Sequence, residues 1–170
     1  KLQPNSHHTA VTQPVVKTVK LASGADFKIK LWDCSGQERF RNISKFYLNK
    51  ASGCIILFSL DSAESLKCAE HWIDSISQIR KEGKQIQIVL VANKCDLPAD
   101  EIEITDWKSR GCALAAQLSD SQYTVPFIHA DTKTGKNIEK LFVEMATALD
   151  NASAMKSPTP SSNGGGCWIL

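Results

Sequence analysis

The 170-residue sequence has no run of eighteen apolar residues, and its first ten residues, KLQPNSHHTA, contain no apolar segment. A membrane-spanning helix and a signal peptide each need such a segment, so we expect neither. Charge of one sign is not in excess, because 20 Lys and Arg stand against 18 Asp and Glu, a net charge of +2. This balance argues against nucleic acid as a partner.

Paired cysteines are also missing. The six cysteines stand singly along the chain, with no CxxC motif. Disulfide frameworks and cysteine metal sites have denser spacing, so we expect reduced thiols in a cytosolic protein. The remaining composition, 42% hydrophobic and 22% charged, is typical of one soluble globular domain.

Short apolar runs alternate with helical periodicity along the chain. We expect a hairpin from 15–21 and 26–32, then strands near 53–61, 86–94 and 123–130. Helices are expected between and after these strands, at 65–82, 105–118 and 137–149, where apolar residues recur every three or four positions. The polar stretch 41–52 is given no element. This order predicts an α/β fold with a mainly parallel sheet and one antiparallel hairpin.

The domain boundary follows a change in composition. Residues 1–151 carry the strands and helices, and we assign them to one domain. Residues 152–170 include SAMKSPTPSSNGGG, which is rich in Ser, Pro and Gly, so we expect a flexible tail there.

Three loops that follow predicted strands contain polar residues suited to a nucleotide: DCSGQE (33–38), NKCD (93–96) and ADTKTG (130–135). Ligands of open α/β sheets bind beyond the carboxyl ends of the strands. The two oxygens of Asp96 can accept both the N1–H and the amine of guanine, a pair that adenine does not offer. Such a contact discriminates strongly between bases. Each loop alone could also be an ordinary polar turn.

The other residues of these loops have uses for the same ligand. Asn93 can bridge loops, and the aliphatic stem of Lys94 can lie on a ring face. Asp33 suits a Mg²⁺ site. Gly36 allows the backbone to approach a terminal phosphate, and Gln37 can orient a water for attack on it.

Together, WDCSGQERF, NKCD and ADTKTG resemble the Ras superfamily of small GTPases, and KIKLWDCSGQERFRNIS and FYL resemble its Rab family. The resemblance runs from about Thr9 to the C-terminus. It implies a P-loop NTPase-like G domain that binds GTP or GDP with Mg²⁺.

The resemblance also implies further site residues. Asp131, Thr132 and Lys133 occupy the place of a Ser-Ala-Lys triplet whose backbone N–H meets the guanine O6. Thr9 aligns best with the threonine that reaches Mg²⁺, and Thr12 is the competing assignment.

One family motif is missing from the sequence: the phosphate-binding G-x-x-x-x-G-K-[ST]. We therefore expect an N-terminally incomplete chain that lacks the first strand, phosphate loop and first helix of the family. The loss of a central strand should leave a gap in the sheet and expose apolar surface near Ile29, Leu31 and 55–57. Without the loop, triphosphate affinity should be low.

The last four residues, CWIL, match a C-a-a-X motif that predicts geranylgeranyl on Cys167. The family resemblance then implies a GTPase switch of vesicle and membrane traffic, on the cytoplasmic face of an intracellular membrane and exchanging with the cytosol. Implied partners are effectors, exchange factors, GTPase-activating proteins and a lipid-shielding chaperone. The alternative is a nucleotide-free, membrane-attached adaptor.

Overall fold

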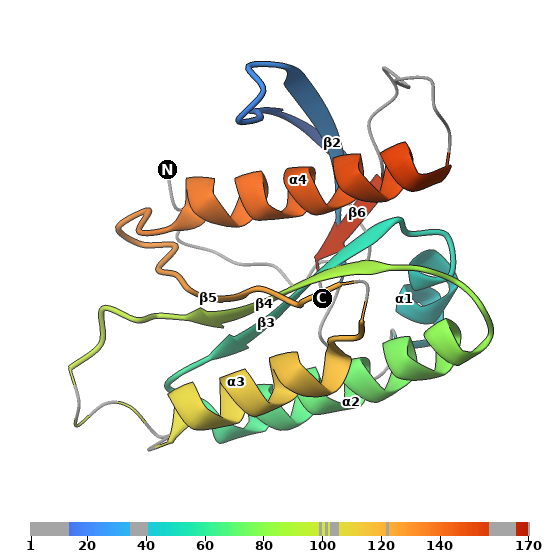
Figure 1. The fold of residues 1–170 in the computed structure, drawn as a ribbon. Coiled ribbons are helices and arrows are strands. Elements are labelled where there is room, and N and C mark those ends of the chain that lie inside the picture. The colour runs from blue at the N-terminus through green and yellow to red at the C-terminus, as the bar shows by residue number, and fades with distance from the viewer. Residues whose placement is uncertain are drawn as a thin grey trace.

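The computed structural model describes the backbone of residues 14–34, 41–98, 100, 102, 106–121, 123–156 and 166–169. Six strands form one sheet in the order β1-β2-β6-β3-β4-β5 (Figure 1). The strands are β1 (Val15–Lys20), β2 (Asp26–Asp33), β3 (Gly53–Ser59), β4 (Gln87–Asn93), β5 (Phe127–His129) and β6 (Gly166–Ile169). β1 pairs with β2 in antiparallel fashion, and all other neighbours are parallel. The predicted α/β class is confirmed.

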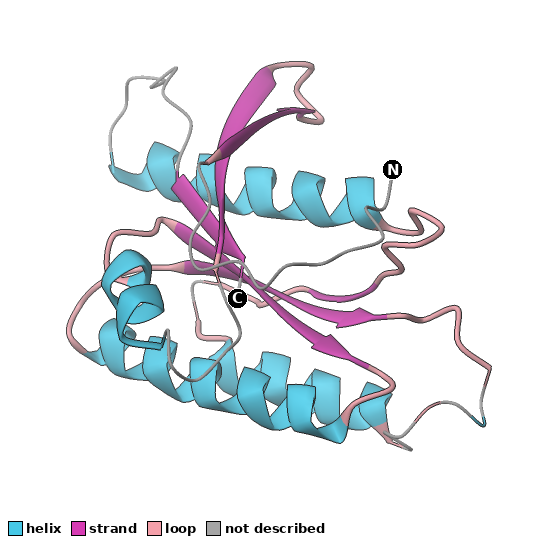
Figure 2. Cartoon of the chain, turned by 180° about the vertical axis from the view of Figure 1, so that it is seen from behind, coloured by secondary structure: helices cyan, strands magenta, loops and turns pink. Residues whose placement is uncertain are grey.

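Four helices accompany the sheet: α1 (Arg41–Leu48), α2 (Ala63–Lys81), α3 (Trp107–Leu118) and α4 (Ile138–Lys156). Helix α4 covers one face of the sheet, and α2 and α3 lie side by side on the other (Figures 1 and 2). This places β3 and β4 between two layers of helix.

The central strands explain the core. Successive side chains of a strand point to opposite faces, so a strand buried on both faces must be apolar at almost every position. In β3 and β4, Ile56 and Leu90 pack toward α2 and α3, while Ile55 and Val89 pack toward α4. All four side chains are at most 1% exposed.

Local signals fix the ends of helix α2. Ser62 is the N-cap, and its side-chain oxygen accepts a hydrogen bond from the Ser65 N–H at 3.2 Å. This satisfies one of the N–H groups that the first turn cannot pair within the helix. Arg80 and Lys81 lie in the last turn, where positive charge is favoured by the helix dipole. Gly83, with φ of 92°, reverses the chain just beyond.

Several elements differ from the expected boundaries. Helix α1 lies in the stretch that was given no element, and β5 is three residues long where eight were expected. Helix α4 continues to Lys156, past the expected domain boundary at 151. Residues 166–169 form β6 instead of continuing a flexible tail.

The expected gap in the sheet is filled. Strand β6 lies between β2 and β3 and pairs with both. Ile29 and Ile56 are fully buried and Ile55 is 1% exposed, while Leu31 and Leu57 are partly buried. The expectation of exposed apolar surface at these residues is therefore wrong, because the chain supplies a strand from its own C-terminal segment.

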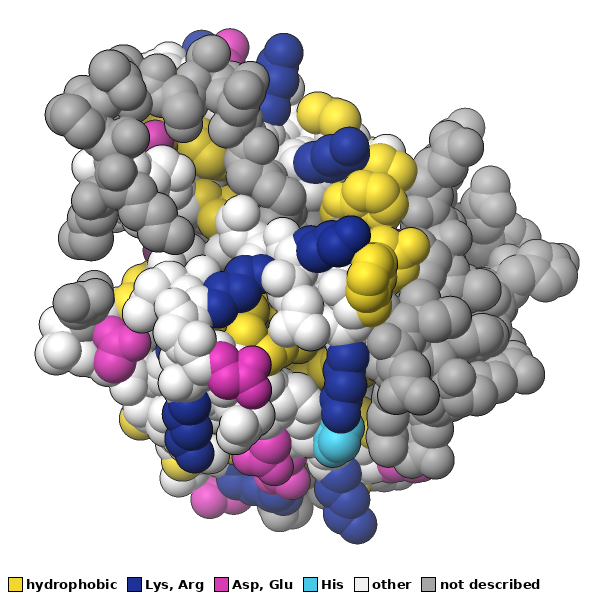
Figure 3. All heavy atoms as spheres, turned by 90° about the vertical axis from the view of Figure 1, so that its right-hand side faces the viewer, with side chains coloured by type: hydrophobic (Ala, Val, Ile, Leu, Met, Phe, Trp, Pro, Cys, Tyr) yellow, Lys and Arg dark blue, Asp and Glu magenta, His cyan; other side chains and the backbone are white. Residues whose placement is uncertain are grey.

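The surface combines lysines with a few apolar side chains. Figure 3 shows hydrophobic side chains exposed between Lys and Arg on one face of the molecule. Val15, Val16 and Phe46 are the large hydrophobic residues that are more than half exposed among the described side chains. Within the described part of the chain, none of the helices has the length and apolar content needed to cross a membrane.

Candidate functional site

The carboxyl ends of β3, β4 and β5 bring two of the three predicted loops together. Ser59 at the end of β3 is in register with Asn93 at the end of β4, and Ala92 is in register with His129 of β5. The backbone ladder continues past the strands, because Ala130 N–H donates to Ala92 O at 2.8 Å and Cys95 N–H donates to Ala130 O at 3.2 Å. The loops 93–96 and 130–135 are therefore neighbours, as the sequence predicted.

A side chain also links the two loops. The Asn93 Oδ1 accepts a hydrogen bond from the Thr132 N–H at 3.3 Å. This is the bridging role expected of Asn93. Thr132 and Lys133 are exposed, so their backbone lies at the surface of the loop. A ligand oxygen that reached the Thr132 N–H would share it with Asn93 or displace it.

Lys94 has an unusual backbone and a fixed side chain. Its φ is 64°, in the left-handed region that a residue with a Cβ seldom occupies. Its Nζ forms an ion pair with Asp61, in the loop between β3 and α2. The hydrogen bond from Lys94, followed by one from Ser59, holds the pKa of Asp61 below its usual range. Strained residues of this kind concentrate at functional sites.

The carboxyl groups of Asp96 and Asp131 lie in different environments at this site. Asp96 is exposed. Asp131 is only 1% exposed, and it accepts hydrogen bonds from the N–H groups of Lys133 at 2.9 Å and Thr134 at 2.7 Å. The Asp131 side chain thus supports its own loop, and Asp96 is the carboxylate of the two that is exposed to a base.

The pKa of Asp131 lies below its usual value. The largest cause is a hydrogen bond from the Thr134 side chain, supported by the backbone N–H groups of Lys133 and Thr134 and by a side-chain hydrogen bond with Asp96, while burial opposes them. A carboxylate stabilised in this way favours folding above its unfolded pKa, and that contribution is lost as the pH falls through the folded value.

We therefore expect Asp131→Asn to lower the melting temperature at neutral pH. The loss follows because an amide accepts hydrogen bonds from the loop less strongly than a carboxylate does. The difference from the native chain should begin to shrink below about pH 4, the ordinary pKa of an unfolded Asp, and disappear only once the pH has fallen through the lower folded pKa of Asp131. Thermal melts from pH 7 to pH 3 measure both effects. Asp150→Asn removes the same charge from an exposed position of α4 and is the matched control; equal losses in both variants would contradict a role for Asp131 in the loop.

Asp33 lies apart from these two loops. It is exposed at the end of β2, where its register partner is Ile169 of β6. Ile169 is in turn in register with Ile55 of β3. This places Asp33 level with Ile55, four residues short of Ser59 and Asn93, or about 13 Å along the strands. Such a separation suits a ligand with a base at one end and a charged group at the other.

Some predicted residues lie outside the described part of the chain. These are Thr9 with its competitor Thr12, Gly36 and Gln37. For Cys167 only the backbone is described, within β6. Among the described residues, no group of three or more His, Cys, Asp or Glu side chains could hold a metal ion.

Two residues at the site were missed by sequence analysis. One is Asp61, which holds Lys94. The other is Asn137, whose Nδ2 donates to His129 O at 2.7 Å and whose φ is 59°. Asparagine tolerates this left-handed conformation better than most residues, so an Asn directly before the helical periodicity of 138–149 was an available signal.

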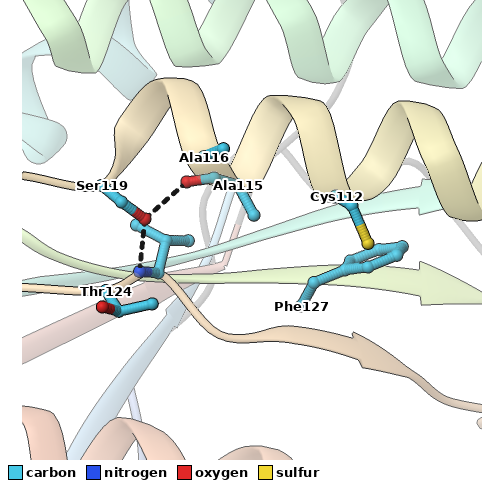
Figure 4. A pocket seen from close by; sticks show the side chains of 7 residues that line it. Cys112, Ala115, Ala116, Ser119, Thr124 and Phe127 are labelled. Carbon is cyan, nitrogen blue, oxygen red and sulfur yellow. Dashed lines mark hydrogen bonds between the residues drawn. The ribbon is translucent and has the colours of Figure 1, made fainter.

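A separate groove of about 390 Å³ lies between α3 and residues 124–127 (Figure 4). Within its lining, Ser119 is satisfied internally, because its Oγ donates to Ala115 O at 2.7 Å and accepts from Val125 N–H at 2.9 Å. None of the predicted site residues lines it.

Comparison with known proteins decides the family. The family model described as "Ras family" matches residues 1–151. The chain belongs to the Ras family. This match and the relatives described below confirm the predicted resemblance to Rab-type small GTPases of the Ras superfamily.

Three relatives of this Ras-family chain illustrate the similarity. Ras-related protein SEC4 of Candida albicans is 34% identical over 134 residues, which cover 79% of this chain and 59% of the relative. Ras-related protein RIC1 of Oryza sativa subsp. japonica is 32% identical over 147 residues, covering 86% and 67%. Ras-related protein Rab-30 of Homo sapiens is 32% identical over 135 residues, covering 79% and 61%. The chain thus spans about 60% of the length of the curated relatives it matches first.

Proposed function

We propose that this chain is part of a guanine-nucleotide-binding switch of vesicle and membrane traffic, in which the loops 93–96 and 130–135 hold the base. The observation that carries the proposal is the junction of these loops. The Asn93–Thr132 hydrogen bond joins them, and the exposed Asp96 carboxylate stands beside it. A further relative, from Zea mays, is named a GTP-binding protein; it is 30% identical to this chain over 139 residues.

Each residue of the base loops has a part in this proposal. Asp96 accepts the N1–H and amine of guanine, and the Thr132 N–H meets the O6, while the Lys133 N–H remains bonded to Asp131. The Lys94 stem, held through its ion pair with Asp61, lies along a ring face. Asp131 shapes the loop that presents these groups.

Hydrolysis and metal binding involve residues nearer β2. Asp33 and Thr9 would hold Mg²⁺, which neutralises phosphate charge when bound. Gly36 would let the backbone approach the terminal phosphate, and Gln37 would orient the attacking water. With the phosphate loop that this sequence lacks, the whole protein would be a slow GTP hydrolase whose loops recruit effectors and respond to exchange factors and GTPase-activating proteins.

Membrane attachment is proposed through geranylgeranyl on Cys167. One lipid gives only limited hold, and Lys156 is the one basic residue between 152 and 170. Attachment should thus be reversible, with a lipid-shielding partner in the cytosol and the cytoplasmic face of an intracellular membrane as the other location. None of the relatives named above favours the nucleotide-free adaptor.

Titration with nucleotides tests the base site directly. We expect Mg²⁺·GDP to shift the backbone amide resonances of residues 93–96 and 130–133, because the guanine base should contact these loops. Mg²⁺·ADP at the same concentration should leave them unchanged, since adenine cannot pair with Asp96. Two-dimensional NMR of the labelled chain measures this even at millimolar affinity. Equal shifts with both nucleotides, or none with either, would overturn the proposed base site.

A further inference from the structure

The groove beside α3 continues toward the end of strand β5. Helix α3 runs in the opposite direction to residues 124–129, as two contacts show. Near the end of the helix, Ser119 Oγ accepts a hydrogen bond from Val125 N–H at 2.9 Å. At its start, the ring of Trp107 lies against that of His129, with centroids 4.7 Å apart. The groove lies toward the Ser119 end, so His129 and Trp107 lie beyond its other end (Figure 4).

Three lysines surround the His129 side chain from two helices. The Nζ of Lys108, in the first turn of α3, lies 5.4 Å from the ring centroid of Trp107, which itself packs on His129. Asn137 Nδ2 donates to His129 O at 2.7 Å, and this bond fixes the start of α4 beside β5. We call the three exposed residues the lysine cluster: Lys108, Lys136 and Lys140. None of them forms an ion pair with a described residue.

Two carboxylates close to the lysine cluster in sequence are engaged elsewhere. Glu139 Oε2 lies 3.0 Å from Lys17 Nζ, and Asp131 accepts hydrogen bonds from its own loop. Asp106, which is exposed directly before α3, is the described acidic residue nearest to Lys108 in sequence. Burial, and after it the charges of the three lysines, lower the pKa of His129, and no carboxylate contributes. Positive charge is therefore in excess around His129.

The shape of the groove favours a peptide over a membrane surface. The groove is concave, with a volume of about 390 Å³. Most of its lining is apolar: Cys112, Ala115, Ala116, Val125 and Phe127, together with Ser119 and Thr124. A volume of this size accommodates a few apolar side chains. A flat bilayer surface cannot fill it.

We propose that the groove and the lysine cluster together bind one extended segment of a partner protein, with apolar residues in the groove and acidic residues at the lysines. Residues 124–129 span at most about 18 Å, so a segment of five or six residues reaches from one part to the other. Its side chains hold it, because Asn137 already occupies the carbonyl of His129 that an added strand would need. This inference goes beyond the proposed nucleotide switch and does not depend on it.

Titration with a defined peptide tests the proposal. The probe is a synthetic peptide of three leucines followed by four glutamates, and its control carries glutamine in place of each glutamate. We expect the acidic peptide to shift the amide resonances of residues 112–119, 124–129 and 136–140 in two-dimensional NMR of the labelled chain. The glutamine peptide should bind on the order of tenfold more weakly, because it cannot pair with the lysines. Added salt should reduce this difference.

Charge reversal locates the acidic half of the segment. Lys136→Glu with Lys140→Glu should weaken binding of the acidic peptide by about tenfold or more. Lys28→Glu with Lys67→Glu is the matched control, because it makes the same change in net charge at exposed positions of β2 and α2. This pair should bind the peptide as the native chain does.

A second pair of variants locates the apolar half. Ala116→Glu places a carboxylate in the groove, where it should disfavour leucine side chains and weaken binding severalfold. Ala113→Glu is its control, since Ala113 is exposed on the same helix and does not line the groove.

Each outcome decides one part of the proposal. No shifts at these residues, or equal affinities for the two peptides, would overturn the docking site. Equal affinities in the two lysine variants would overturn the role of the lysine cluster, and equal affinities in the two alanine variants would overturn that of the groove. Vesicles of anionic phospholipid that shift the same resonances as strongly as the peptide does would overturn the peptide and indicate a membrane surface.

Discussion

An Asp96→Asn chain should prefer xanthine over guanine nucleotides, with the ratio of the two affinities changed by about a hundredfold or more. The carboxylate accepts two hydrogen bonds from guanine, and an amide cannot accept the one from the amine. Xanthine carries an oxygen in place of that amine, to which the Asn side chain can donate. Asp96 is exposed beside the Asn93–Thr132 link, so the substitution leaves that link in place. Its contact with the buried Asp131 can be kept, because an amide can donate a hydrogen bond to that carboxylate.

Competition between GDP and xanthosine diphosphate measures this change as a ratio, which is independent of how weak the absolute affinity is. Asp100→Asn provides the control, because it removes the same charge from another exposed position nearby. If Asp96→Asn and Asp100→Asn keep the same preference for guanine, Asp96 is not part of the base site.

Gly111→Val should lower the free energy of unfolding by about 1–3 kcal/mol. A Cβ at Gly111 would lie 2.1 Å from the Cζ of Phe127 and within 2.6 Å of two further ring atoms. Valine is by itself somewhat more favourable than glycine in a helix, so the steric conflict must outweigh that gain. Displacing the ring would disturb its stacking on Phe58, whose ring centroid lies 6.2 Å away.

Urea unfolding of the two proteins measures this loss. Ala113→Val, at an exposed position of the same helix α3, is the control for the effect of a β-branched residue on helix stability. A similar midpoint for Gly111→Val and the native chain would mean that α3 can move away from β5 at little cost.

The elements that could be predicted from the sequence are those whose signal lies within their own residues. β3 and β4 were predicted because burial on both faces requires apolar runs, which IILF and IVLVA supply. Helix α1 was missed because it is only eight residues long, and so short a pattern does not distinguish a helix from a polar loop. β6 was missed because no local property of GCWI distinguishes a strand from a tail; only the edges of β2 and β3, far away in sequence, give it partners.

The same distinction applies to the site. The adjacency of 93–96 and 130–135 could be predicted, because both follow parallel strands that end at one edge of the sheet. The ion pair of Lys94 with Asp61 could not, because it depends on the left-handed backbone of Lys94 and on a residue 33 positions away. By contrast, the hydrogen bonds from its own loop to Asp131 had an available signal, because an Asp in a turn commonly accepts from the N–H two residues on.

The position of β6 also sets the order in which the sheet can assemble. The β1–β2 hairpin is local and can form early, but its pairing with β3 runs entirely through β6. Leu31 and Cys167, which are in register, are 136 residues apart in the sequence (167 − 31). Closing so long a loop costs entropy that must be spent before the contact stabilises anything. Among the described residues, the pairing of the hairpin with the remainder of the sheet is therefore the contact that we expect to form last.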